Sequence, residues 1–500
     1  MLALNIKSFA KDTLTYGLFN MIGRFFTLLL TPLYSNYLTP SENGILAYLF
    51  SLIIFVQFIY SFGMEASFFR YFTNNETSVY DDDTYKKKVF TASYFTILLL
   101  GVFFTTLMII FSVPLSNVVI GNDFPNSTYI FQIIVFVPLF DQLSTIPLSR
   151  FRITGEAKKF ATVRLLLVVF STSLSAFFLL TTDLGVLGIF MGILITTFSC
   201  FIYFVPTIIK SLDLNIDFKL FKEMFIFGLP TLPVSLSSIA LQVADRPIMK
   251  LFVNNSDIGV YQINAKLAVP MLVFVSIFDY AWKPFYLSHF KEQNAKSIFS
   301  RILTYYIFIG SVLFLFITFF MDYIIRIPLW EGKTLIHSDY WSGLSVVGII
   351  GLGYLINGIT TNFAAVFHIE KKTKYLPVAL TISAAVSIAL NFTLLPIMGI
   401  TGAAISSLVG YTIGMLIMKA LQSKVSYKIN YEWKRIIIIV ISYVVILLSE
   451  KYIVSQLQGT ILFITRIGLI LTYVLLLRLF GFFTAGELSQ IKKTFRKKQQ

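Results

Sequence analysis

Three ionisable side chains lie inside one apolar stretch of this sequence, residues 219–268. Asp245 and Arg246 are neighbours in its first half, and Lys266 lies in its second half. A charged side chain at the centre of a membrane helix costs about 2.5–3.5 kcal/mol on insertion scales, and such side chains often line substrate or ion pathways. The stretch therefore predicts a polar path through a membrane. For Arg246, a local salt bridge with Asp245 is an equal alternative.

Further polar side chains recur at helical spacing in other apolar segments. Residues three or four positions apart share one face of a helix, so each set predicts a polar stripe. Such a stripe either contacts substrate or joins packed helices through modest hydrogen bonds. Glu65 either titrates in an ion-coupling cycle or pairs with Arg70. The candidate substrate-binding residues are Arg24, Lys266, Arg70, Arg246, Asn20, Gln57 and Gln242, and the candidate ion-coupling carboxylates are Glu65 and Asp245.

The stretch from 219 to 268 also contains three prolines, Pro230, Pro233 and Pro247. Proline removes a backbone hydrogen bond and favours bending of a helix. The prolines therefore predict a bent helix, which acts either as a hinge or as a static kink.

The composition is that of a polytopic membrane protein. Of the 500 residues, 56% are apolar and only 13% are charged, whereas about 25% are charged in average soluble domains. The single cysteine, Cys200, excludes an intrachain disulfide and a cysteine-rich metal site. No small-residue cleavage site follows the first apolar run, so we expect the first helix to remain as an anchor.

Apolar windows of about 20 residues, the length that spans a bilayer core, recur along the whole chain. They predict an all-α protein with about 14 transmembrane helices. The expected spans are residues 13–37, 44–72, 89–113, 128–149, 163–182, 185–209, 224–252, 258–282, 299–326, 340–367, 376–396, 399–421, 435–453 and 459–481.

The basic residues are distributed unevenly between the loops. If the N-terminus lies inside, most of the 40 Lys and Arg residues fall in inner segments and few in outer loops. This asymmetry predicts a multi-pass protein with both termini in the cytoplasm. It also explains the net charge of +15 without a nucleic-acid partner. The basic tail KKTFRKK is suited to anionic membrane lipid.

The sequence contains an internal repeat. SENGILAY at residues 41–48 returns as SDIGVYQI at 256–263, and the basic turn that ends at Lys159 returns at Lys374, both with an offset of 215 residues. The common offset predicts two parallel six-helix repeats around a central cavity, with two more helices after them in the chain. The predicted organisation is an N-terminal lobe at 1–210, a C-terminal lobe at 219–421, two additional helices at 433–481 and a basic cytoplasmic tail at 482–500.

No motif in the chain indicates an enzyme. There is no G-x-x-x-x-G-K-[ST] for ATP, and His289, His337 and His368 lack the spacing of metal ligands. No loop is long enough to form a catalytic domain outside the bilayer. We therefore expect a transporter without cofactor or metal.

Several stretches resemble the Wzx-type polysaccharide flippases of the multidrug/oligosaccharidyl-lipid/polysaccharide exporter superfamily. They are KDTLTYGLFNMIGRFFTLLLTPLYSNYLTPSENGI near the start, FRITGEAKKFATV, FGLPTLPVSLSSIALQVADRPIMKLFVNNSDIGVYQINAKLA, AWKPF and EKKTKYLP. Together they cover most of residues 10–400 in order.

The resemblance implies a two-lobed transporter that carries undecaprenyl-diphosphate-linked oligosaccharide across the bacterial inner membrane, for O-antigen, capsule or exopolysaccharide. It also implies membrane lipid and glycan polymerase machinery as partners, and alternating access by rocking of the lobes. Relatives that flip the peptidoglycan precursor carry cavity arginines on helices 1, 2 and 8. By position these correspond to Arg24, Arg70 and Lys266. At position 266 a lysine replaces the arginine, and a lysine cannot form a bidentate contact.

Two other functions stay open. A drug/cation antiporter of the same superfamily would have an acidic cavity, whereas the predicted cavity is basic. A membrane enzyme of glycan assembly would need a catalytic outer loop, and the sequence contains none of sufficient length.

Overall fold

A computed structural model describes residues 23, 25–73, 81–121, 124–215, 217–329 and 332–483. Within these ranges the fold is helical, apart from an isolated antiparallel bridge between Pro328 and Thr334. The candidates Asn20 and Arg24 lie outside the described residues, as does the basic tail from residue 484 onward. The predicted all-α class is confirmed.

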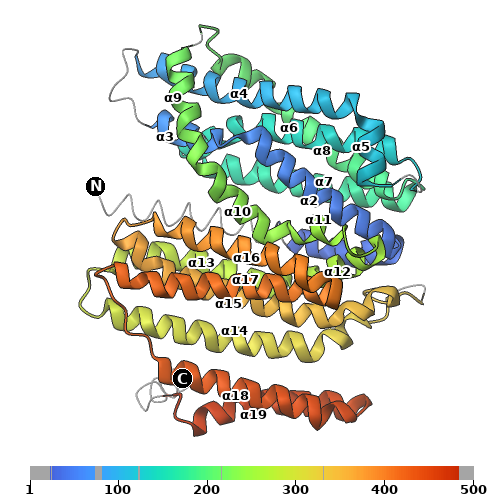
Figure 1. The fold of residues 1–500 in the computed structure, drawn as a ribbon, viewed down its shortest axis with the longest axis vertical. Helices are drawn as coiled ribbons and strands as arrows, with labels where there is room; N and C mark the ends of the chain where they lie inside the picture. The colour runs from blue at the N-terminus through green and yellow to red at the C-terminus, as the bar shows by residue number, and fades with distance from the viewer. Residues whose placement is uncertain are drawn as a thin grey trace, which may run out of the picture.

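The first half of the chain forms the upper body in Figure 1. A helix that ends at residue 37 precedes α2. The helices that follow are α2 (Pro40–Ser61), α3 (Met64–Phe72), α4 (Asp82–Ile110), α5 (Ser112–Val119), α6 (Ser127–Ile153), α7 (Ala157–Thr181) and α8 (Val186–Ser211).

Most of the second half forms the body below it, although α9 lies beside the upper body, and the last two long helices lie at the bottom (Figure 1). The elements are α9 (Phe218–Gly228), η1 (Leu229–Thr231), α10 (Leu232–Val243), α11 (Asp245–Met249), α12 (Asn255–Leu267), α13 (Val269–His289), α14 (Ala295–Ile325), η3 (Ser338–Gly343), α15 (Leu344–Ile369), α16 (Tyr375–Met398), α17 (Ile400–Leu421), η4 (Gln422–Lys424), α18 (Trp433–Tyr452), η5 (Val454–Gln456) and α19 (Gly459–Leu479).

The described residues contain 11 helices long and apolar enough to cross a membrane, or 12 if the bent pair α12–α13 is one span. The predicted count of 14 stays a prediction. Of the two other predicted spans, residues 13–37 lie partly outside the described ranges. The second corresponds to α18, a 20-residue helix with Lys434 and Arg435 at one end and Glu450 and Lys451 at the other.

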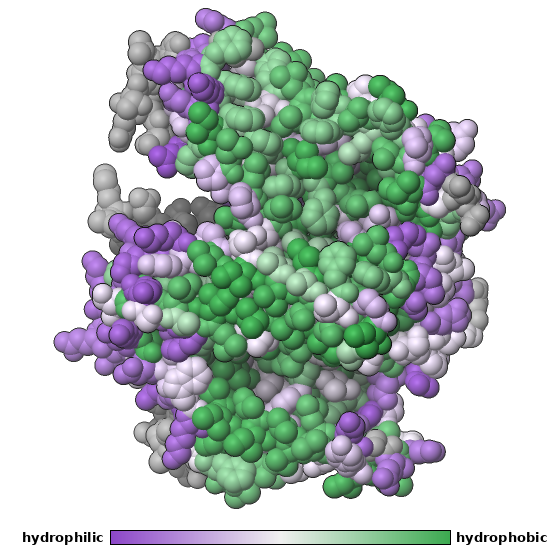
Figure 2. All heavy atoms as spheres, in the orientation of Figure 1, coloured by the Kyte–Doolittle hydropathy of each residue, from purple (hydrophilic) through white to green (hydrophobic). Residues whose placement is uncertain are grey.

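The surface agrees with a multi-pass membrane protein. Figure 2 shows apolar residues across the middle of the visible face, while hydrophilic residues gather at the two ends of the helices. A surface of this kind matches a bilayer, whose apolar core excludes charged side chains and whose interfaces accept them.

Two helices begin at equivalent points of the repeat. Thr39 caps α2 in a capping box, in which its hydroxyl accepts from the Glu42 amide and the Glu42 carboxylate accepts from the Thr39 amide. Asn254, 215 residues later, caps α12 by accepting from the Asp257 amide at 2.8 Å. Local capping thus stabilises the start of both helices.

α2 and α12 cross in direct backbone contact. A Cβ on Gly44 would lie 1.7 Å from the carbonyl oxygen of Asn255, and a Cβ on Gly259 would lie 1.9 Å from that of Pro40. The 215-residue offset converts each contact into the other, so the crossing is reciprocal. Only glycine allows this approach at both positions. We call this end of the molecule the joined end, and the opposite end of the helices the far end.

The proline-containing segment is one span interrupted by a 3₁₀ turn, and its two parts contact different bodies. α9 packs on α3 and α4 of the upper body, where Ser67 donates to the Met224 carbonyl at 2.8 Å. After η1, which contains Pro230, α10 packs on α16, where Ser237 donates to Thr381 at 3.1 Å. This segment therefore bridges the two bodies (Figure 1).

Charged side chains attach the terminal helix pair to α14. Arg466 on α19 lies 3.0 Å from Asp322 on α14 and 2.8 Å from Glu450 on α18. Ser311 on α14 also forms a 2.6 Å hydrogen bond with Tyr473 on α19. Removal of one partner from a buried ion cluster leaves an uncompensated charge, so these contacts set the position of the pair.

Candidate substrate cavity and ion sites

Asp245 and Arg246 form an ion pair inside a closed network. Nη1 of Arg246 lies 2.6 Å from Oδ1 of Asp245 and also donates to the Gln242 carbonyl at 2.7 Å. Nε of Arg246 donates to Oε1 of Gln262 at 3.1 Å. The Tyr261 hydroxyl donates to Oδ2 of Asp245 at 2.5 Å. The local salt bridge considered from the sequence is present, and it neutralises both charges.

A small cavity lies against this network between α10, α11, α12, α15 and α17. Besides the charged pair it is lined by Tyr354, Ser407 and Tyr411. The sequence did not single out Tyr261 or Tyr411. Tyrosines in apolar helices usually pack in the core, so only the tertiary structure shows that Tyr261 bonds to Asp245 and that Tyr411 lines this cavity.

Lys266 lies near the C-terminal end of α12. Its Nζ is 4.9 Å from the centre of the Tyr34 ring, a cation–π contact with the helix that ends at residue 37. Among the described residues, no carboxylate lies within ion-pair distance of Lys266. The chain bends by 45° immediately afterwards, between α12 and α13, where Pro270 lacks an N–H to donate. Lys266 is thus a fixed cation beside a break in a membrane span.

Glu65 and Arg70 do not pair with each other. The Glu65 carboxylate accepts from Ser149 at 2.8 Å and lies 3.3 Å from Nη1 of Arg152. Arg70 instead lies over the Phe227 ring, with Cζ 4.7 Å from its centre. The pairing considered from the sequence is therefore wrong.

The cause is a kink between α2 and α3. Phe62 and Gly63 both have positive φ, +42° and +70°. A Cβ on Gly63 would lie 2.8 Å from the Gly228 carbonyl oxygen, so the kink lets α9 approach closely. The single span at residues 44–72 expected from the sequence is interrupted here, and α3 turns Glu65 toward α6.

Gln57 contacts a carboxylate that sequence reasoning did not select. Its Nε2 donates to Oδ2 of Asp141 on α6 at 2.9 Å. The available signal was the presence of Asp141 in an apolar span, which by itself marks a functional candidate.

Polar contacts join the two bodies at the joined end. Asn36 donates to the Thr334 carbonyl at 2.9 Å. Asn43 donates to the Tyr340 hydroxyl at 2.5 Å, and Asn264 donates to the Tyr340 carbonyl at 2.8 Å. The loop before α15 thus connects α2 with α12, and all of these bonds lie beside the glycine crossing.

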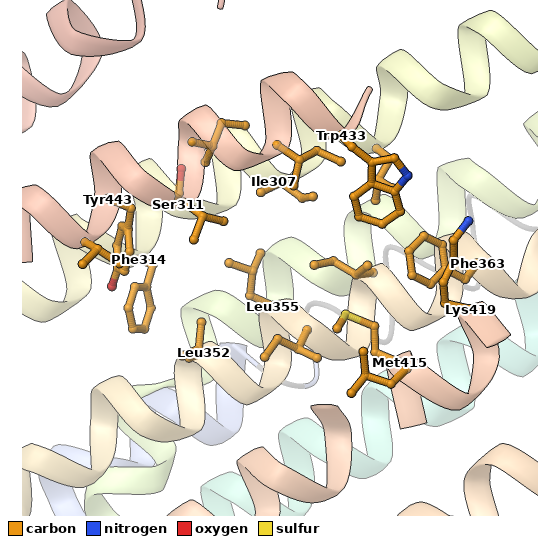
Figure 3. A pocket seen from close by; sticks show the side chains of 18 residues that line it. Ile307, Ser311, Phe314, Leu352, Leu355, Phe363, Met415, Lys419, Trp433 and Tyr443 are labelled. Atoms are coloured by element: carbon orange, nitrogen blue, oxygen red, sulfur yellow. The ribbon is translucent and has the colours of Figure 1, made fainter. Parts of the chain in front are cut away.

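An apolar cavity of about 460 Å³ lies between α18 and helices α14, α15 and α17. Figure 3 shows Lys419, Phe363 and Trp433 at one end and Phe314 and Tyr443 at the other. Aliphatic side chains line the space between them. Such a lining suits a hydrocarbon chain better than a sugar, which would leave hydroxyls without hydrogen bonds.

Within the part of the chain that the structure describes, no group of three or more His, Cys, Asp or Glu side chains is placed to hold a metal ion.

Known structures share this fold. The lipid II flippase MurJ, in an inward closed conformation, matches with a TM-score of 0.73 at 18% identity, over 93% of this chain and 97% of that one. A multidrug resistance MATE family transporter of the MOP superfamily, in an inward-facing conformation, matches with a TM-score of 0.59 at 14% identity, over 83% and 98%. No curated protein shows significant sequence similarity to the chain.

A family model described as polysaccharide biosynthesis protein matches residues 35–332, more than half of the sequence. The superfamily resemblance recognised in the sequence is confirmed by this match and by the shared fold. The chain belongs to the polysaccharide biosynthesis protein family and is a multi-pass membrane protein with the fold of the MOP superfamily.

Proposed function

We propose that this protein is a flippase, and not an enzyme, that moves undecaprenyl-diphosphate-linked oligosaccharide across the bacterial inner membrane. The glycan is an O-antigen, capsule or exopolysaccharide repeat unit, and both chain termini lie in the cytoplasm. The observation that carries the proposal is Lys266, a membrane-embedded cation without a carboxylate partner among the described residues. The family assignment and the fold shared with MurJ support it.

The chemistry of Lys266 fits a diphosphate. A diphosphate loses its hydration when it enters a membrane, and a fixed cation replaces part of that hydration through charge-assisted hydrogen bonds. Arg246 is less suited to this task because Asp245 already neutralises it. Arg24 and Arg70, assigned by resemblance, remain proposed partners of Lys266 in the grip on the diphosphate.

In alternating access, the two bodies would separate at the joined end and come together at the far end. The two bodies are connected at the joined end by the glycine crossing and the bonds of Tyr340. The break at η1 allows α9 to stay with one body while α10 moves with the other. The apolar cavity beside α18 offers a place for part of the lipid chain while the head group passes between the bodies.

The second candidate is a drug/cation antiporter, which the fold shared with a MATE family transporter favours. Cationic drugs need an uncompensated carboxylate in the cavity, whereas both predicted ion-coupling carboxylates, Glu65 and Asp245, have arginine partners. The electrostatics therefore favour an anionic cargo.

The deciding experiment compares the lipid-linked glycans of a deletion strain complemented with wild type or with Arg24→Ala. For a flippase, undecaprenyl-linked oligosaccharide accumulates on the cytoplasmic face, surface polysaccharide is lost, and only wild type restores it. Unchanged surface glycan with increased drug sensitivity supports the antiporter instead. Full complementation by Arg24→Ala removes Arg24 from the diphosphate grip.

A further inference from the structure

Asp141 is a carboxylate in the middle of a membrane helix. It lies near the centre of α6, and Oδ2 accepts a 2.9 Å hydrogen bond from Nε2 of Gln57 on α2. Within the described ranges, no Lys or Arg lies at ion-pair distance from it. An ionised carboxylate in a membrane span is expensive to maintain, and such groups commonly carry protons in transporters.

The two coupling carboxylates predicted from the sequence already have cations, and so does Asp322. Glu65 lies beside Arg152, Asp245 beside Arg246, and Asp322 beside Arg466. Protonation of such a carboxylate would leave its arginine without a partner. The structure therefore does not favour the two coupling carboxylates predicted from the sequence, and it leaves Asp141 as a better proton carrier.

The groups that face Asp141 come from the helices packed against α6. Arg164 on α7 is the charged side chain that acts on Asp141 through space, and the Cys200 thiol lies near it on α8. On α2 the neighbour is the neutral amide of Gln57. On α3, Glu65 bonds to Ser149, two turns further along α6. Asp141 thus has one hydrogen-bond donor that responds directly to its protonation.

We propose that Asp141 binds and releases the proton that drives the conformational change, and that Gln57 transmits its protonation state to α2. A proton from water on one side adds to the carboxylate, and the Gln57 N–H loses its anionic acceptor. The proton later leaves to water on the other side, which restores the carboxylate. Each cycle moves one proton and consumes nothing else.

α2 links this site to the joined end. The same 22-residue helix carries Gln57 beside Asp141 and Gly44 against Asn255. Because a helix of this length moves largely as a rigid rod, a shift at Gln57 is transmitted to the crossing with α12. The inference rests on the proposed function, since it supplies the energy source for that transport.

The test measures conformation rather than transport. Spin labels on Asp83→Cys and Thr373→Cys, two exposed positions on different bodies, report the distance between the bodies in full-length protein in lipid nanodiscs. Cys200→Ser keeps a small polar group and removes the native thiol. A proton bound ten times more tightly in one conformation changes the population ratio by about tenfold across the titration.

We expect wild type to show this change between acidic and neutral pH, and Asp141→Asn to lose it. Asp141→Glu restores a titratable group and a pH response, which distinguishes proton binding from a structural role. Gln57→Leu keeps the carboxylate but uncouples it, so its distances become insensitive to pH. Asp183→Asn, in the exposed turn between α7 and α8, serves as the matched control and behaves as wild type.

A pH response retained by Asp141→Asn overturns the inference, as does a wild type without any response. Either result leaves the flippase proposal in place, because the distances are measured without substrate. The flippase proposal fails separately if the deletion strain exports its surface glycan normally.

Discussion

At the scale of single residues, the partners of each charge decide what the charge can do. Arg246 and Lys266 look alike in the sequence, since both are cations in one apolar stretch. The structure separates them: Arg246 lies 2.6 Å from a carboxylate, whereas Lys266 faces the Tyr34 ring. A paired cation stabilises the protein, and an unpaired one is available to an anionic ligand.

Substitution of Lys266 should therefore affect transport more than folding. A hydrogen bond to a charged group contributes about 1.5–3 kcal/mol, so Lys266→Gln should lower surface glycan export by at least about tenfold. Lys266→Arg keeps the charge and should retain most of the export. Quantification of surface polysaccharide at matched protein levels gives the result. Lys158→Gln, at the exposed start of α7, is the control. Normal export with Lys266→Gln would exclude Lys266 from the cargo site.

At the scale of elements, interruptions in the helices place the functional groups. The kink at Phe62 and Gly63 turns Glu65 toward α6, and the break at η1 divides one span between two bodies. At each interruption, two backbone segments approach each other more closely than a continuous helix would allow. The terminal pair is placed differently, through the ion cluster of Arg466, and this placement leaves an apolar cavity between α18 and the body.

Filling that cavity should impair a substrate with a long lipid chain. Val440 and Val445 lie on the same helix and are similarly exposed, but only Val440 lines the cavity. Val440→Trp should reduce glycan export because the indole occupies the space of the chain, while Val445→Trp should leave export unchanged. The thermal stability of both purified variants separates a blocked cavity from misfolding. Equal export by the two variants would show that the cavity does not serve the cargo.

At the scale of the whole molecule, the two bodies meet through a reciprocal contact. The glycines of the two repeats lie against each other's helix starts, and polar bonds from Asn36 and Asn43 reinforce the junction. Buried apolar side chains of both helices, among them Ile45 of α2 and Ile258 of α12, also belong to one hydrophobic cluster at this junction. A transporter that alternates between two openings has to separate this junction, polar bonds and apolar contacts together.

Holding the joined end closed should stop transport reversibly. Nδ2 of Asn36 lies 2.9 Å from the carbonyl oxygen of Thr334. A cleavable cross-linker between Asn36→Cys and Thr334→Cys therefore connects the two bodies. Export should fall on cross-linking and recover on cleavage. The control pair Ser116→Cys and Thr128→Cys, 3.1 Å apart within one body, should have no effect. Export that continues with the bodies cross-linked would contradict alternating access at this junction.

The sequence by itself determined the helical class and the membrane spans that the structure describes, and it contains the capping residues of α2 and α12, which the structure revealed. These features are local, because hydropathy acts over one span and a cap acts over four residues. The repeat offset also predicted that Gly44 and Gly259 are equivalent, but not that each contacts the helix start of the other repeat.

Only the tertiary structure decided which polar groups meet. Gln57 and Asp141 lie 84 positions apart, and Asn36 and Thr334 lie 298 positions apart. Helical periodicity places a residue on a face but does not say which helix that face contacts. The pairing of Glu65 with Arg70, one of two alternatives from the sequence, is absent for this reason, since a two-residue kink changed the face that its helix presents. The sequence therefore predicted candidate residues, and packing showed which of them already have partners.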